Sequence, residues 1–346
     1  MYFIGVDHHK QFSVMTVLDE QGKELRTERL QNTRFEVESF LREFGGEPFA
    51  AVVEAGRSSY VMADLLRELG GEVKMANPSQ VKSIAHARIK TDKRDSEKLA
   101  HLLRMGYIPE VYQRESSNRE AQRVLRLRAF WINLRGQVKN KIRALLAQQD
   151  EEVQGAVAER ESRLFSGKGQ EFLKGLRLKG KDGEIRDVLL KAYGAFEGFI
   201  KESDGLVERL YQELPEAQLL DTLPGFARTL SVLAAVEIGD ISRFPRAESL
   251  QAYAGLIPST HGSGGRIFHG HIIKQGNSWL RWAMVEAVHP AIKVDFGLNL
   301  FYQRLKRRKG PNVAKVATAR RLTAIVFRML KEKRKYIPYQ EKTSAA

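Results

Sequence analysis

The chain has 346 residues, no cysteine and a formal net charge of +15, and its pI is near 9.8. This length allows two or three domains that each bury a core, and the lack of cysteine excludes disulfides, cysteine-ligated zinc and thiol nucleophiles. The amino terminus has no basic region followed by a long apolar one, and no stretch approaches the ~20 apolar residues that span a bilayer, so we expect a soluble, cytoplasmic protein.

The first hundred residues predict an α/β domain, because short β-rich runs alternate with helical patterns. The expected elements, in chain order, are strands over residues 2–7, 12–19 and 23–30, a helix over 33–44, a strand over 49–54, a helix over 58–69, a strand over 72–76, and helices that begin near 77 and 91. The run at 49–54 is apolar at almost every position, which is typical of a strand with both faces covered. This order of elements is that of an RNase-H-like fold.

Four acidic residues fall where such a fold gathers metal ligands. Asp7 and Glu54 end two strands that would be neighbours, and ligands of open sheets collect beyond the carboxyl ends of the strands. Asp92 and Asp95 share one face of a helix that Thr91 would cap. Carboxylates about 5 Å apart repel by roughly 3 kcal/mol per pair at an effective dielectric of about 20, so the cluster predicts bound Mg²⁺ or Mn²⁺. Each acid alone could instead be a surface charge or a helix cap.

ATP binding is an alternative that starts from the same first strand. Sugar kinases and actin-like ATPases also begin with a glycine and an aspartate on their first hairpin, and they need glycines there so that the backbone surrounds phosphates. Here the bulky residues His8, His9 and Lys10 follow Asp7, and no second glycine-rich phosphate hairpin occurs downstream. The sequence therefore disfavours ATP binding.

The positive charge lies outside the first domain. Residues 1–115 hold 17 Lys and Arg against 18 Asp and Glu, which leaves 40 against 24 for the rest of the chain. Residues 304–335 hold 13 basic residues and one acid; the aromatic residue Phe327 lies among them, and Phe301 and Tyr302 come just before them. Such a region suits phosphate backbones and stacking on bases. A solvated helix face is the alternative interpretation.

The middle of the chain predicts a helical arm. Residues 119–148 carry apolar side chains at near-heptad spacing with basic residues on either side, and the expected seam is Val124, Leu127, Trp131, Leu134, Val138 and Leu145. This helix could pair with the helical stretch over 187–214, or with its own copy in a second chain as a dimer contact. The glycine- and lysine-rich residues 167–183 predict a loop between the two helices.

The carboxyl-terminal part predicts a mainly helical domain. Residues 223–227, followed by a helix over 229–238, resemble a helix-hairpin-helix element, whose glycine turn lets backbone amides approach a phosphate. A simple helix–turn–helix core is the alternative. After a further helix over 244–255, the glycine-rich residues 257–266 predict a flexible loop, and flexibility there favours a functional role.

These motifs resemble the DEDD-type insertion-sequence transposases, the family of bridge-RNA-guided serine recombinases with a RuvC-like domain, to which Piv-like DNA invertases are related. The first half shows the acids of the RuvC-like domain at Asp7, Glu54, Asp92 and Asp95. The second half shows Tyr-Ala-Gly-Leu-Ile-Pro at 253–258, Ser-Gly-Gly at 263–265, Ile-Lys-Gln-Gly-Asn at 273–277 and Leu-Arg at 280–281. The resemblance covers nearly the whole chain.

The resemblance implies a role for each group of residues in the active site. A serine of the carboxyl-terminal domain, Ser263 here, attacks a DNA phosphodiester and leaves a covalent phosphoserine, while the four acids hold magnesium beside it. Ser259 is the second choice, and Ser263 could also merely shape a turn. The resemblance also implies that a structured noncoding RNA selects donor and target DNA. The residues that we expect to contact nucleic acid are Arg266, Lys274, Arg281, Arg307, Arg308, Arg320 and Arg321.

We therefore predict a transposase or recombinase of an insertion sequence. Its expected parts are a RuvC-like metal domain over 1–115, a helical coiled-coil arm over 116–214, a serine transposase domain over 215–335 and a flexible tail over 336–346. Because strand exchange cuts several strands in concert, we expect a homodimer or tetramer. The competing hypotheses are an unguided DNA invertase with the same chemistry, a RuvC-like structure-specific nuclease that uses water and the acids alone, and a catalytically silent RNA-binding protein.

Overall fold

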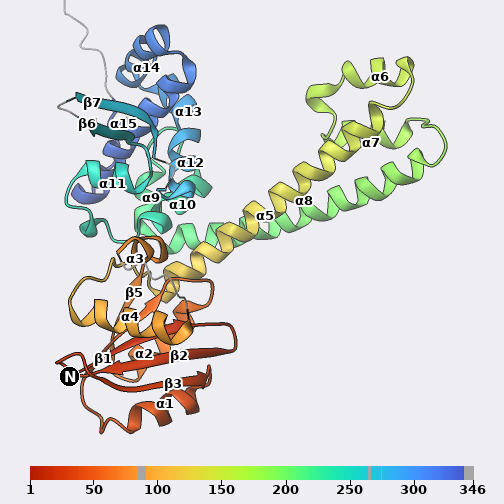
Figure 1. Cartoon of the computed structure of the whole chain (residues 1–346). Coiled ribbons are helices and arrows are strands. Elements are labelled where there is room, and N and C mark those ends of the chain that lie inside the picture. The colour runs from red at the N-terminus through yellow and green to blue at the C-terminus, as the bar shows by residue number, and fades with distance from the viewer. Residues whose placement is uncertain (85–90, 264–265, 274, 339–346) are drawn as a thin grey trace, which may run out of the picture. The chain divides into compact units, whose positions relative to one another are not determined.

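A computed structural model of the chain describes residues 1–84, 91–263, 266–273 and 275–338. The chain divides into two compact units, Met1–Arg114 and Glu115–Ala346 (Figure 1). Among the described residues, none of the helices combines the length and the hydrophobicity that crossing a membrane requires.

The first unit is built on a five-stranded sheet with the strand order β3-β2-β1-β4-β5. Its strands are β1 Tyr2–His8, β2 Phe12–Leu18, β3 Glu24–Gln31, β4 Phe49–Glu54 and β5 Glu72–Ala76. The first three strands form an antiparallel meander, whereas β4 runs parallel to β1 and β5 runs parallel to β4. This topology is that of the RNase-H-like fold, so the predicted class of the first domain is confirmed.

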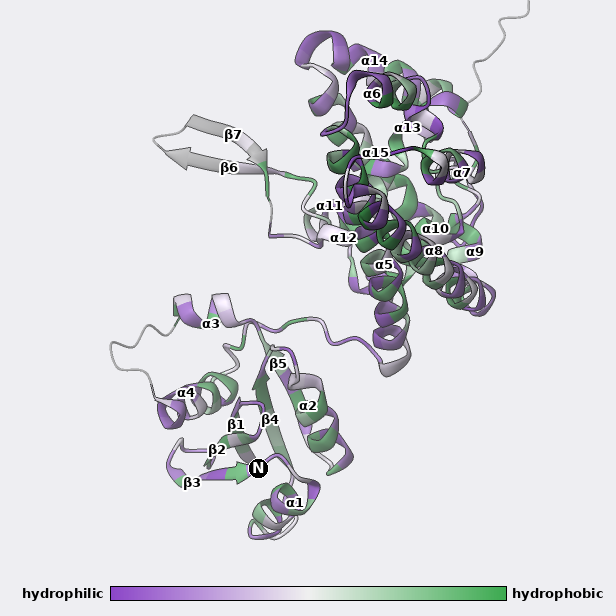
Figure 2. Cartoon of the chain, turned by 90° about the vertical axis from the view of Figure 1, so that its right-hand side faces the viewer, coloured by the Kyte–Doolittle hydropathy of each residue, from purple (hydrophilic) through white to green (hydrophobic). Residues whose placement is uncertain are grey.

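Helices cover both faces of this sheet. They are α1 Arg34–Arg42, α2 Ser59–Glu68, α3 Pro78–Ile84 and α4 Asp92–Arg104. One core lies between the sheet and the helices α1 and α2, and a second core lies on the opposite face, under α3 and α4. Figure 2 shows the hydrophobic strand β4 between α2 and α4. Because both faces of β4 are covered, its first five residues are buried and apolar, and only Glu54 at its end is partly exposed.

The second unit begins with an antiparallel helical arm, in which α5 Ser116–Leu146 packs along α8 Asp182–Glu213 (Figure 1). The predicted pairing of two helices within the chain is therefore found. The predicted seam is wrong in part, since Leu127 is 40% exposed. The α5 residues that are buried are Ala121, Leu125, Val138, Ile142 and Leu146. The reason is that the two ends of α5 pack into different cores, one in the helical domain and one at the tip of the arm.

The tip of the arm holds more helix than we predicted. Between α5 and α8 lie α6 Glu151–Ala158, the short 3₁₀ helix η1 Glu161–Arg163 and α7 Gly167–Gly175. The predicted loop over 167–183 is therefore wrong for its first half. Two contacts explain α7: the Ser166 side chain accepts a hydrogen bond from the amide of Gly169 and caps the helix, and Leu173 is fully buried in the core of the tip.

The rest of the second unit is a helical domain with a β-hairpin, so the predicted mainly helical class is confirmed. Its elements are α9 Pro215–Leu220, α10 Arg228–Ile238, η2 Ile241–Arg243, α11 Ala247–Tyr253, β6 Pro258–Ser263, β7 Arg266–Ile272, α12 Ser278–Glu286, α13 Val288–Val294, α14 Phe296–Lys309 and α15 Pro311–Glu332. Its core also takes in Ala121, Leu125 and Val207 from the base of the arm. The arm and this domain therefore share one core.

The glycine turn between α9 and α10 packs inward. Gly225 has φ 91°, and a Cβ at this position would lie 2.6 Å from the carbonyl oxygen of Ala287. The next residue, Phe226, is fully buried. Gly225 therefore allows close packing within the domain, and the simple helical core that the sequence left open is sufficient to explain this turn.

Candidate active site

Asp7 and Glu54 stand at the carboxyl ends of neighbouring parallel strands. Val6 of β1 pairs with Val53 of β4, so the residues that follow them, Asp7 and Glu54, are at the same level. Val6 and Val53 belong to the core under α1 and α2. Because side chains alternate along a strand, the two acids belong to the opposite face, which α4 covers.

Helix α4 reaches this face because it packs directly on the backbone of β1. A Cβ at Gly5 would lie 1.9 Å from the carbonyl oxygen of Ser96 and 2.5 Å from the amide nitrogen of Ala100, so this approach requires glycine. Ser96 is fully buried, and its hydroxyl lies 2.8 Å from the hydroxyl of Thr16 on β2. These contacts hold the first turn of α4, which begins with Asp92, beside the end of β1.

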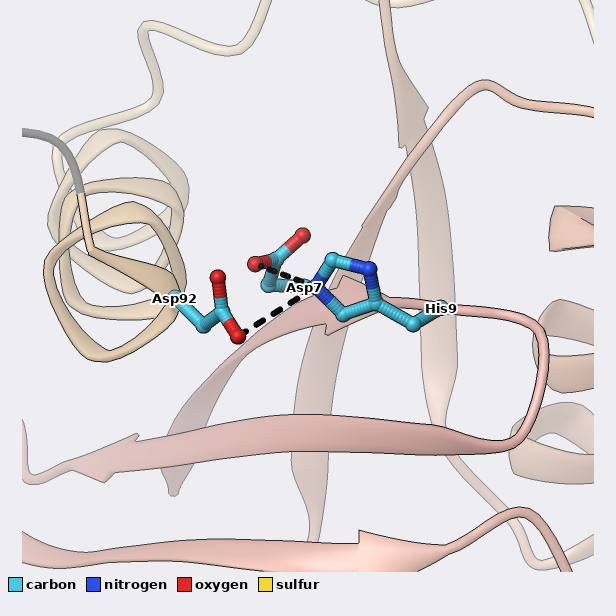
Figure 3. A group of neighbouring side chains, drawn as sticks. All are labelled: Asp7, His9 and Asp92. Carbon is cyan, nitrogen blue, oxygen red and sulfur yellow. Dashed lines mark hydrogen bonds and ion pairs between the residues drawn. The ribbon is translucent and has the colours of Figure 1, made fainter.

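Asp7, His9 and Asp92 form a compact cluster, as Figure 3 shows. The His9 Nε2 atom lies 3.2 Å from Asp7 Oδ2 and 3.5 Å from Asp92 Oδ2. One ligand atom from each of the three residues lies within 4.8 Å of the other two. Our sequence reasoning did not find His9 as part of the site. The signal that could have found it is its position, two residues after Asp7 and directly after the first strand.

The electrostatics of the cluster favour a cation. Burial is the main reason why the pKa of the Asp7 carboxyl lies above its usual value; the charge of His9 opposes this shift, and the charges of Asp92 and Asp95 add to it. Asp7 is only 21% exposed, so water screens these like charges incompletely. A divalent cation between the carboxylates would remove this repulsion.

The four predicted acids are brought together to different degrees. In the described part of the chain, Asp7 and Asp92 lie at ligand distance within the cluster with His9. Asp95 is near enough to raise the pKa of Asp7, and its Oδ1 atom lies 3.2 Å from the ammonium of Lys98. Glu54 is located by strand register, level with Asp7 on the α4 face.

Ser263 belongs to strand β6, so the prediction of a flexible loop is wrong for residues 258–263 and for Arg266. β6 and β7 pair antiparallel, and Ser263 at the end of β6 pairs with Arg266 at the start of β7. The glycines of this segment do not prevent strand pairing. The run that begins at Arg266 contains Ile267, Phe268 and Ile272, which are good strand formers. Lys274, a predicted phosphate contact, lies outside the described residues.

Ser259, the second candidate nucleophile, lies near the start of β6. A Cβ on Gly270 would lie 2.5 Å from Ser259 Oγ, so the Ser259 hydroxyl packs against the neighbouring strand. The hydroxyl therefore occupies the space that the missing side chain of Gly270 leaves. Ser263, in contrast, is the last residue of its strand.

The base of the hairpin, which we call the stem, joins the motifs at 253–258 and 273–277. Gly255 has φ 67°. A Cβ on Gly276 would lie 2.3 Å from the amide nitrogen of Gly255, so the backbones of the two glycines are in direct contact. The amide of Asn277 donates to the carbonyl of Tyr253 at 2.6 Å. The side chain of Asn277 then caps α12, as it accepts hydrogen bonds from the first amides of that helix.

A buried carboxylate, Glu237 of α10, links the stem to the arm. Glu237 is 1% exposed and forms an ion pair with Arg126 of α5. It also accepts hydrogen bonds from Asn277 Nδ2 at 2.7 Å and from Gln122 Nε2 at 3.1 Å, and the Arg126 guanidinium lies 3.8 Å from the centre of the Trp279 ring. Our sequence reasoning missed Glu237, because a lone glutamate in an apolar helix carries no pattern.

Glu237→Ala is expected to lower the free energy of unfolding by about 3 kcal/mol, because it leaves Arg126 without its buried counter-charge. The matched control is Asp204→Ala, which removes the partner of Arg128 on the same helix. Asp204 is 49% exposed, so we expect a loss of about 0–1 kcal/mol. Urea unfolding followed by circular dichroism measures both variants. Equal losses would show that the buried carboxylate does not hold the stem.

The other predicted phosphate-binding residues fall into two groups. Arg281 donates to a main-chain carbonyl at 3.2 Å and Arg320 donates to a glutamine side chain at 2.9 Å, so both serve packing within the domain. Arg307 and Arg308 are exposed in the last turn of α14, and Arg321 is exposed on α15. The second group faces solvent and is available to phosphate.

Two family models match the chain. One, described as "Transposase IS116/IS110/IS902 family", matches residues 217–303. The other, a DEDD-type IS110 model described as "Transposase", matches residues 4–149. The second match includes all four predicted acids, and the first includes the β6–β7 hairpin.

Two curated relatives are similar to the chain over most of its length, and a third over less than half of it. The "Probable family 20 transposase" of Pseudomonas aeruginosa is 25% identical over 97% of this chain and 98% of its own. The "Transposase for insertion sequence element IS1111A" of Coxiella burnetii is 23% identical over 96% of this chain and 90% of its own. The "Pilin gene-inverting protein" of Moraxella bovis is 32% identical over 40% of this chain and 45% of its own.

Proposed function

Because the chain belongs to the IS110 family of transposases, enzymes that act on DNA by transesterification, we propose that it moves an insertion sequence by attack of Ser263 on DNA phosphodiesters beside a bound divalent metal ion. The cluster of Asp7, His9 and Asp92 is the observation that carries this proposal. It brings the carboxylate of Asp7, at the end of β1, next to that of Asp92 in the first turn of α4. Burial first, and then the neighbouring like charges, raise the pKa of Asp7.

The four predicted acids fit Mg²⁺ or Mn²⁺. Carboxylate oxygens are the ligands that these ions prefer, and we assign Asp7, Asp92, Glu54 and Asp95 to hold them. His9 Nε2 lies between two of these carboxylates. When bound, such an ion neutralises negative charge that develops on the phosphate oxygens.

Ser263 supplies the nucleophile in this proposal. Its Oγ forms a bond to phosphorus, the bond from phosphorus to the leaving deoxyribose oxygen breaks, and the leaving oxygen gains a proton as the hydroxyl loses one. One phosphodiester replaces another, so attack by a new DNA hydroxyl can reverse the step and join strands without an external energy source. The pairing of Ser263 with Arg266 across the hairpin supports a role for Arg266 in holding the phosphate.

We propose that a structured noncoding RNA selects the DNA to be joined. The excess of basic residues lies outside residues 1–115, and a diffuse basic surface suits a folded RNA, which proteins recognise by shape and phosphates. Since strand exchange needs several cuts in concert, a homodimer or tetramer is the expected assembly.

Site-specific DNA inversion without a guide is the second candidate function. It is favoured by the similarity to the pilin gene-inverting protein of Moraxella bovis. Inversion and transposition would use the same acids and the same serine, so the active site does not distinguish them. Whether the reaction depends on RNA distinguishes the two functions.

Recombination before and after RNase treatment tests the guided function. We would purify the protein from cells that carry the whole element with its flanking DNA, and sequence any RNA that copurifies. A guided transposase loses joining activity after RNase treatment and regains it when the transcribed RNA is added back. Joining that survives RNase treatment, with no specific RNA in the preparation, would favour the unguided invertase.

A further inference from the structure

A groove of about 970 Å³ lies in the second unit, between α14, α15 and the residues 334–338 that follow α15. One side of it comes from α14, a second from the outer face of α15, and a third from this last segment. It shares no lining residue with the β6–β7 hairpin among the described residues. The proposed transesterification therefore assigns it no role.

The third side of the groove is held in place by Tyr336. Its hydroxyl donates to the carboxylate of Asp295, which is 4% exposed and also caps α14 by accepting from the amide of Leu298. The amide of Tyr336 donates to Thr222 Oγ1 at 3.0 Å. These bonds fix the last described residues against the helical domain, so the groove is built into the fold.

Five cationic side chains line the groove; they are Arg304, Arg321, Arg328, Arg334 and Lys335. Arg334 pairs with Glu332 at 2.7 Å. Within the described part of the chain, Arg304, Arg321 and Arg328 make no ion pair with an acidic residue. The carboxylate that lines the groove, Asp295, is already engaged by Tyr336. The groove therefore has an unbalanced positive charge that an anion would neutralise.

Apolar and aromatic surface lies between these cations. Phe296 is 45% exposed, Leu300 is 57% exposed and Ile337 is 75% exposed, although all three line the groove. The guanidinium of Arg321 lies 5.0 Å from the centre of the Phe301 ring, which gives a second flat surface. Exposed apolar surface beside several arginines is costly in water and favours a ligand that has both flat apolar faces and anionic groups.

We propose that this groove binds single-stranded nucleic acid, with an unstacked base against Phe296 and phosphates at Arg304, Arg321 and Arg328. Base faces are apolar and flat, and they are linked by phosphates, so a single strand matches both features of the groove. A duplex hides its base faces in stacking and would use only the cations. The inference deepens the proposed function, since it names single strands as the form of nucleic acid that this part of the domain recognises.

Fluorescence anisotropy with short labelled oligonucleotides tests the proposal on the full chain, without Mg²⁺ so that no strand is cut. The probes are single-stranded RNA, single-stranded DNA, the same strands with abasic positions, and a duplex of equal length. We expect Arg328→Glu to weaken single-strand binding by about tenfold or more, and to make its salt dependence shallower, since each phosphate contact contributes a slope of about 0.7. The RNA and DNA arms show which strand the groove prefers.

The matched control is Lys331→Glu, which makes the same charge change on the same helix at a position that does not line the groove. We expect it to weaken binding much less than Arg328→Glu. Phe296→Leu keeps apolar contact but removes the aromatic plane, and we expect about a tenfold loss for intact strands. The abasic strand should bind wild type and Phe296→Leu equally, because it has no base to stack.

Equal losses for Arg328→Glu and Lys331→Glu would overturn the proposal, because they would indicate general attraction to a basic surface. Duplex binding as tight as single-strand binding, with no effect of Phe296→Leu, would also overturn it. A third outcome would assign the groove to a protein partner. In that outcome, an acidic peptide or a second copy of the chain binds, its binding depends on Arg328, and it displaces no oligonucleotide. Failure of the proposed serine chemistry is a separate outcome, since Ser263→Ala should leave this binding unchanged.

Discussion

Ser263→Ala is expected to abolish DNA strand joining and the covalent protein–DNA intermediate, with a rate loss of about 10³-fold or more, because alanine has no hydroxyl to attack phosphorus. The change removes one oxygen at the end of β6 and should leave the fold intact. Denaturing gels of labelled donor and target DNA measure joining, and circular dichroism checks folding.

Ser259→Ala is the matched control for this prediction. It removes the same group from the same strand, at a hydroxyl that packs against Gly270, so joining should be largely kept. If Ser259→Ala were inactive and Ser263→Ala active, the nucleophile would be Ser259. If both variants still released cut ends with free phosphates, the enzyme would be a RuvC-like nuclease that uses water.

Asp7→Asn is expected to reduce joining by about 10³-fold while it stabilises the metal-free protein. Activity falls because the amide cannot supply the anionic ligand that a divalent ion needs. Stability rises because the charge of Asp7 is unfavourable in the folded protein: burial first, and then the charges of Asp92 and Asp95, raise its pKa against the opposing effect of His9.

The pH dependence of this stability effect has a definite sign. The folded pKa of Asp7 lies above its usual value of 3.8, so the stabilising contribution of the protonated carboxyl is complete below that value and is lost as the pH rises through the folded pKa. Metal-free wild type should therefore be less stable than Asp7→Asn at neutral pH, and this difference should vanish as the pH falls to about 3.8 and below. Thermal unfolding at a series of pH values measures it.

At neutral pH, Mg²⁺ should reverse the order of stability of wild type and Asp7→Asn. At ten times its Kd, Mg²⁺ should stabilise wild type by about 1.4 kcal/mol and Asp7→Asn by much less. Glu97→Gln on α4 is the matched control, because it neutralises an acid of the same helix outside the cluster of Asp7, His9 and Asp92. The control should keep the full Mg²⁺ shift. A full shift in Asp7→Asn would show that the ion binds elsewhere.

The first domain was predictable because its local patterns agree with one another. An apolar run such as Phe49–Glu54 has few alternatives to a buried strand. Thr91 caps α4 as predicted, accepting from the amide of Arg94. The position of acids at strand ends then follows from the strand order. What no pattern revealed is the tight contact of α4 on Gly5, since a glycine in a strand has several possible causes.

The second unit was less predictable, because its functional parts depend on contacts between distant residues. Glycines over 257–266 suggested flexibility, but residues 258–263 form a strand that pairs with β7. Gly225 suggested a phosphate turn, whereas its neighbour is the carbonyl of Ala287. The role of Glu237 arises only when α5 and the stem pack on α10. Local sequence patterns contain little information about such packing between distant residues.

Trapping a covalent adduct is the most direct test of the claim that the acids of the first unit and Ser263 of the second act on the same phosphodiester. The full-length protein would be incubated with DNA and Mg²⁺, quenched, digested with nuclease and protease, and mapped by mass spectrometry. We predict a nucleotide attached to Ser263 that forms only with the divalent ion and is absent in Asp7→Asn. An adduct that forms equally well in Asp7→Asn and in the presence of a chelator, or cleaved DNA with no modified peptide, would contradict this claim.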